Sequence, residues 1–124
     1  MKTVLSVGVL LLAAVLSNAA HAAPGDELAA DLDRVCAAVP APAASASLTD
    51  QARAVDIYAM GIAAYQECLY TELRSRRASL TQSEQAVIAR RLSRSAFDLT
   101  AARQDYASAV RAARSTVQVA ERTN

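Results

Sequence analysis

The chain contains two cysteines, Cys36 and Cys68, and their pairing is the feature that most restricts the possible folds. In an exported protein, an intramolecular disulfide is the expected state of such a pair, with free thiols or an intermolecular bridge as alternatives. The bridge would close a loop of about 33 residues, which in the chain-entropy treatment stabilises the fold by roughly 3.5–4 kcal/mol. The pairing expected for these cysteines therefore depends on whether the chain is exported.

Residues 1–22 have the organisation of a bacterial signal peptide. Lys2 provides the positive charge, and a predominantly apolar run of thirteen residues follows from Val4 to Leu16. This run is short for a membrane span, which needs about 20 apolar residues. Small residues then occupy positions −3 and −1 of a cleavage site. We therefore expect cleavage after Ala22 and a periplasmic or secreted location, with an uncleaved N-terminal anchor as the alternative.

Cleavage would leave residues 23–124 without lysine or histidine, because Lys2 and His21 are the only ones in the chain. Twelve arginines would then face twelve acidic residues, for a net charge of zero. Catalysis at neutral pH usually recruits His, Lys, an activated Ser or Cys, or a metal ion. No glycine-rich phosphate loop, HExxH motif or GxSxG motif occurs. We expect a protein that is not an enzyme, with no catalytic residues, no bound metal and no cofactor.

A short acidic helix is predicted over residues 26–39. Its apolar residues recur at spacings of three and four, and Asp26 is suited to be its N-cap. Pro40 is expected to end it, and residues 40–47, which contain only Pro, Ala and Ser, predict an extended linker. The apolar face of this helix consists of Leu28, Leu32, Val35 and Val39.

Two long helices are predicted in the remainder of the chain. The second begins at Leu48 after a capping-box pattern and has about 29 residues. The third covers about residues 82–121, after a break at residues 79–84 that carries another capping box; one continuous helix through this break is the alternative. The apolar stripe of the second helix consists of Val55, Tyr58, Ile62, Tyr65 and Leu69, and that of the third includes Ile88, Leu92, Leu99, Ala102, Tyr106, Ala109, Ala113 and Ala120.

These elements predict an all-α fold, in which residues 48–124 form an antiparallel hairpin of two long helices. Residues 23–47 supply the short helix and the linker, tethered to the hairpin by the disulfide. The third helix would reach about 60 Å and the second only about 43 Å, so the third must extend past its partner. The protruding part is rich in alanine, which permits close approach of another helix and predicts a weak homodimer.

Charge is distributed unevenly along the chain. Residues 23–72 carry a net charge of −6 and residues 73–124 a net charge of +6. A hairpin would gather six arginines near its turn, and the disulfide would bring the acidic first helix to the same end. The arginines are then either neutralised internally or available as a patch for an anionic partner. They are Arg74, Arg76, Arg77, Arg90, Arg91 and Arg94.

The function expected from these observations is that of a small, non-catalytic, exported helical protein of the bacterial cell envelope, acting as an interaction or structural module. Its partner would be another protein or an anionic envelope component. Nucleic acid is not an expected partner of an exported chain. The alternative is a periplasmic chaperone-like or stress-sensing hairpin protein, which would hold unfolded clients on a concave apolar face.

Overall fold

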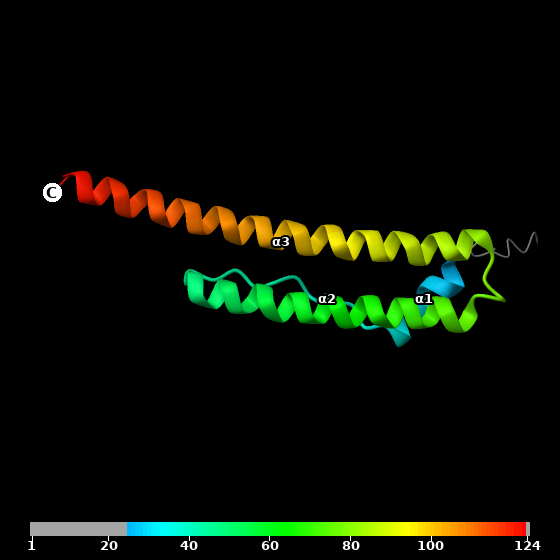
Figure 1. Ribbon diagram of the computed structural model, residues 1–124. Coiled ribbons are helices and arrows are strands. Elements are labelled where there is room, and N and C mark those ends of the chain that lie inside the picture. The colour runs from blue at the N-terminus through cyan, green and yellow to red at the C-terminus, as the bar shows by residue number, and fades with distance from the viewer. Residues whose placement is uncertain (1–24, 124) are drawn as a thin grey trace, which may run out of the picture.

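The computed structural model describes residues 25–123, and these form three α-helices and no strand (Figure 1). The helices are α1 (Asp26–Val35), α2 (Leu48–Arg76) and α3 (Gln82–Thr123). The all-α prediction is therefore confirmed. The predicted signal peptide, with its cleavage site after Ala22, lies outside the described residues. No helix in the described part of the chain is both long and apolar enough to cross a membrane.

The long helices α2 and α3 lie side by side and run in opposite directions (Figure 1). The turn between them is held by a reciprocal capping box. The backbone N–H of Thr81 donates to Glu84 Oε2 at 2.7 Å, and the N–H of Glu84 donates to Thr81 Oγ1 at 3.2 Å. This cap separates the two helices without glycine or proline, so the alternative of one continuous helix is wrong.

The start of α2 uses only half of its predicted capping box. Ser47 Oγ accepts a hydrogen bond from the N–H of Asp50 at 3.3 Å. The N–H of Ser47 bonds to Ser45 Oγ, also at 3.3 Å, rather than to the Asp50 carboxylate. Aspartate is one methylene shorter than the glutamate of a full box, which accounts for the missing return bond.

Helix α1 ends at Val35, four residues before the predicted end, and Cys36 already has extended backbone angles. The distance that the linker must cover explains why α1 ends at Val35. Leu48 and Cys68 are about 30 Å apart along α2, and the chain must return over that distance from the cysteine pair. If the helix continued to Val39, nine residues at about 3.3–3.6 Å each would barely span it. Ending at Val35 leaves slack. The N-cap of α1 also differs from the prediction, because it is Gly25 and not Asp26.

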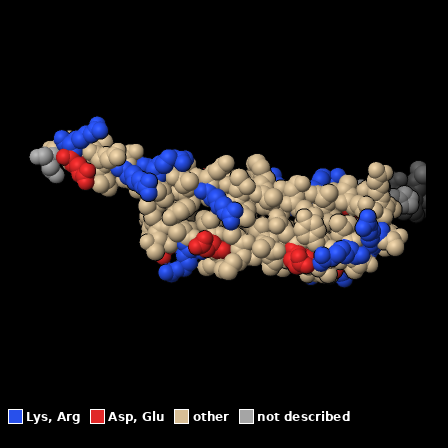
Figure 2. Space-filling model, in the orientation of Figure 1, with Lys and Arg blue, Asp and Glu red and all other residues tan. Residues whose placement is uncertain are grey.

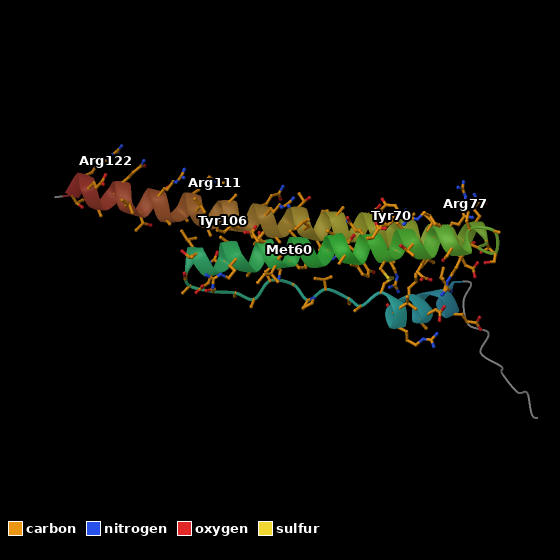
Figure 3. The ribbon with its side chains drawn as sticks, turned by 60° about the horizontal axis from the view of Figure 1, so that its bottom comes forward. Met60, Tyr70, Arg77, Tyr106, Arg111 and Arg122 are labelled. Carbon is orange, nitrogen blue, oxygen red and sulfur yellow. A yellow bond between two sulfur atoms is a disulfide. The ribbon has the colours of Figure 1, made fainter. Side chains whose placement is uncertain are left out.

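The linker is attached to α2 at two points. Val39 packs over Gly61, where an added Cβ would come within 2.8 Å of Val39 Cγ1. Nearer the start of α2, the side-chain amide of Gln51 donates to the carbonyl oxygen of Ser45. The extended chain therefore follows the surface of α2 (Figure 3), and glycine at position 61 permits the close approach.

The hydrophobic core lies at the end of the molecule that contains the α2–α3 turn. Leu28 and Leu32 of α1 pack there against Leu69 of α2 and Ile88 of α3, and all four side chains are buried. The predicted cysteine pair closes the same cluster: Cys36 and Cys68 are at disulfide distance, with Cα atoms 5.7 Å apart. Helix α1 is thus held at this end by both packing and a covalent bond.

Helix α3 extends well past the start of α2 (Figure 1), because it has 42 residues and α2 has 29. Val110 and Ala113 are half-buried near Leu48, whereas every residue from 114 to 123 is exposed. We call residues 114–123 the overhang. The prediction that it is rich in alanine is wrong, because Ala102, Ala109 and Ala113 are half-buried alongside α2 and only Ala120 lies in the overhang. Arg122 lies on this protruding end (Figure 3).

Candidate functional site

The six arginines singled out in the sequence lie on the last turns of α2, at its C-cap and on the first half of α3. They surround the end of the molecule where α1 is docked, and Arg77 is close to the α2–α3 turn (Figure 3). On the face shown in Figure 2, basic side chains lie together at this end, and acidic side chains lie beside them. The individual contacts divide the six into three groups.

Arg76 and Arg91 bind α1. Arg76 Nη1 lies 2.6 Å from Asp31 Oδ2, and its Nε lies 2.7 Å from Glu72 Oε2. The hydrogen bond from Arg76 is the main reason that the pKa of Asp31 is lowered. Arg91 donates to Asp33 Oδ1 at 2.7 Å and to the carbonyl oxygen of Ala29 at 3.2 Å. Since both arginines are partly buried, their main role is to hold α1 in place.

Arg74 and Arg94 make exposed ion pairs within their own helices. Arg74 Nη2 lies 2.9 Å from Glu67 Oε1, and both side chains are about two-thirds exposed. Arg94 Nε lies 3.0 Å from Asp98 Oδ1, one turn away. Pairs this exposed contribute about 0–1 kcal/mol, because water screens them and two long side chains must be ordered. These arginines can exchange their partners at little cost.

Arg77 and Arg90 are exposed, and neither makes a hydrogen bond or ion pair with any of the described residues. Near Arg90 on α3, Arg94 lies over the ring of Phe97, 5.7 Å from its centroid, and this ring is 65% exposed. Arg90, Arg94 and Phe97 follow one another at i, i+4 and i+7. They form an outward strip of two cations and one aromatic ring, which we call the Arg–Phe strip.

Phe97 was not predicted as a site residue, because it lies off the apolar stripe of α3. Ser95 was not predicted either; it is buried in the α2–α3 seam and accepts a hydrogen bond from Gln66 Nε2 at 3.0 Å. A signal for Phe97 was present in its spacing from Arg90. The sequence contained no such signal for Ser95, since a serine in a helix is ordinarily expected to face solvent.

A half-open groove of about 650 Å³ lies between the linker, α2 and α3. Tyr58 and Tyr106 contribute to its wall, together with Asp98 and Asp105. Burial is the main reason that the pKa of Tyr58 is raised. The groove exists because α1 fills this side of the helix pair at one end, and only the thin extended linker covers it at the other.

Within residues 25–123, no three His, Cys, Asp or Glu side chains are grouped so that they could hold a metal ion. Comparisons of the chain with protein-family models, with curated proteins and with solved structures found no match.

Proposed function

We propose that the chain is a non-catalytic, exported helical module of the bacterial cell envelope, and that it binds an anionic envelope component through the Arg–Phe strip and Arg77. Export is supported by the signal-like residues 1–22 and by a cysteine pair at disulfide distance, which is compatible with an oxidising compartment. The antiparallel α2–α3 hairpin serves as the rigid support for this surface.

The observation that carries the proposal is the exposed strip of Arg90, Arg94 and Phe97 on one side of α3. The planar guanidinium group binds phosphate or carboxylate through two parallel hydrogen bonds. An exposed aromatic ring beside it suits the boundary between the headgroups and the acyl chains of a lipid surface. With a net charge of zero after cleavage, attraction would act only at short range, within a Debye length of about 8 Å.

Helix α1 determines which arginines are available. Asp31 and Asp33 engage Arg76 and Arg91, while Arg90 remains unpaired among the described side chains. The acidic first helix therefore confines the candidate surface to the outer side of α3 and the turn. The contacts of Arg76 and Arg91 with α1 have a structural role.

Binding to vesicles that contain phosphatidylglycerol tests the proposal, with purely zwitterionic vesicles as the reference. The protein is purified from an exporting bacterial host. Near an anionic surface each arginine contributes about 1 kcal/mol, so Arg90→Gln/Arg94→Gln should bind about thirtyfold more weakly than wild type. Arg103→Gln/Arg111→Gln removes the same charge from exposed positions of the same helix outside the strip, and this control should bind as wild type does.

Wild-type protein that ignores anionic vesicles even at low salt would contradict the proposal. Equal weakening by both double variants would also contradict it, because attraction would then depend on total charge rather than on the strip. Mass spectrometry of the same preparation tests export: the expected N-terminus is Ala23, and the mass should be two hydrogens below that of the dithiol.

A chaperone-like function is the second candidate, and one observation favours it. Ile57 and Met60, one turn apart on α2, are 59% and 66% exposed. Suppression of aggregation of a reduced client protein would support this function if it were lost in Ile57→Ser/Met60→Ser and retained in the Arg90→Gln/Arg94→Gln variant. An inactive wild-type protein would eliminate this candidate.

A further inference from the structure

The apolar seam of α3 continues beyond the point where α2 can cover it. Val110 and Ala113 are half-buried near Leu48, the first residue of α2. The same face continues at the next seam positions, Val117 and Ala120, and both are exposed. In heptad terms, the valines occupy position a and the alanines position d. The overhang thus presents a short coiled-coil seam whose partner helix has ended.

Opposite charges flank this open seam. Arg114 and Glu121 each follow a seam alanine by one residue, so both occupy position e and lie seven residues apart on the same side. The corresponding g positions are Ala109 and Thr116, which are uncharged. Among the described residues, neither Arg114 nor Glu121 makes an ion pair.

This pattern distinguishes between the two possible orientations of a second helix. In a parallel pair, position e faces position g of the partner, and the charges would meet only alanine and threonine. In an antiparallel pair, position e faces position e. Arg114 of one copy can then meet Glu121 of the other, and the two-fold symmetry repeats the contact.

The register follows from the same residues. When Arg114 lies beside Glu121 of the second copy, Val117 packs beside Ala120 of that copy. A register one heptad deeper would place Arg114 beside its own counterpart, with like charges in contact. It would also push the second copy into the space held by Leu48. The clash with Leu48 and the repulsion between like charges both disfavour the deeper register, so both favour the register that places Arg114 beside Glu121 of the second copy.

We propose that the overhang binds a second copy of this chain as an antiparallel, two-fold symmetric helix pair, joined by two Arg114–Glu121 contacts around Val117. Each overhang continues the line of the other copy's α2 and covers its open seam. The overlap is about ten residues, with small side chains, which places this interface among weak and reversible ones. The contact is separate from the Arg–Phe strip and does not depend on the anionic partner.

Charge reversal tests the proposal by sedimentation velocity over rising protein concentration. Arg114→Glu alone and Glu121→Arg alone each place like charges in both contacts, so each should associate about tenfold more weakly than wild type. An equimolar mixture of the two variants restores both attractive contacts, and should associate as wild type does. Parallel pairing does not predict this rescue.

Two exposed valines provide the matched control for the apolar part. Val117→Asn changes the centre of the seam and should abolish association, whereas Val119→Asn changes the opposite side of the same helix and should leave association unchanged. Val119 is 63% exposed and Val117 58%, so neither substitution should disturb the fold, and circular dichroism checks this. A strictly monomeric wild-type protein, no recovery in the mixture, or equal effects of the two valine variants would overturn the proposal.

Discussion

Reduction of the Cys36–Cys68 disulfide should release α1 and lower stability strongly. The cysteines are 32 residues apart in sequence. Opening a loop of this size restores chain entropy worth roughly 3.5–4 kcal/mol. In a domain of about 100 residues, each kcal/mol shifts the thermal midpoint by about 4–8 °C, so reduction should lower it by about 15–30 °C.

The structure indicates which part unfolds. Helix α1 has ten residues, fewer than the roughly 12–15 that an isolated helix needs to be even marginally stable. Once untethered, it would lose its packing on Leu69 and Ile88, which are fully buried beneath it. The loss of helical signal should therefore begin in α1, with α2 and α3 unfolding at higher temperature.

Thermal melts followed by circular dichroism, with and without reductant, measure the shift, and amide hydrogen exchange locates it. The Cys36→Ala/Cys68→Ala variant should resemble the reduced wild type and should not respond to reductant, which controls for effects of the reagent itself. If reduction left the midpoint within a few degrees and the amides of α1 equally protected, packing alone would hold α1, and the reasoning would be refuted.

Three further predictions concern the contacts of α1 and the linker. Arg91→Gln should destabilise the fold by about 1 kcal/mol in chemical denaturation, because it removes the contacts that hold α1, and an unchanged midpoint would contradict their role. The pKa of Asp31 is lowered from 3.8 mainly by its hydrogen bond from Arg76. The ionised carboxylate of Asp31 therefore stabilises the folded state at pH values above its unfolded-state pKa. This stabilisation is lost as the pH falls through the lower folded-state pKa. Wild type and Asp31→Asn should therefore converge in thermal stability below about pH 4. Gly61→Ala should stabilise the helix by about 1 kcal/mol only when Val39 is also replaced by Ala, since the valine methyl otherwise occupies the space; equal effects in both backgrounds would show that the linker is not packed there.

The arginine-rich end shows the limit of reasoning from sequence. The clustering of arginines could be predicted from their positions along two helices joined by a turn. The pairing of individual arginines could not be predicted. Asp31 and Asp33 are only two residues apart in α1, yet they contact arginines from different helices. Such contacts depend on how α1 is docked, and no local pattern encodes that.

The sequence by itself determined the helical class, the burial of the α2 stripe and the cysteine pairing. Spacings of three and four bring Tyr58, Ile62 and Leu69 to one side of a helix, and all three are buried. Only the tertiary structure decided where α1 ends and what the seam contains. The end at Val35 reflects the distance the linker must cover, and the burial of Ser95 depends on Gln66 reaching it from the other helix. Periodicity is a local property that the backbone carries with it, whereas loop length and partnership exist only once distant segments are brought together.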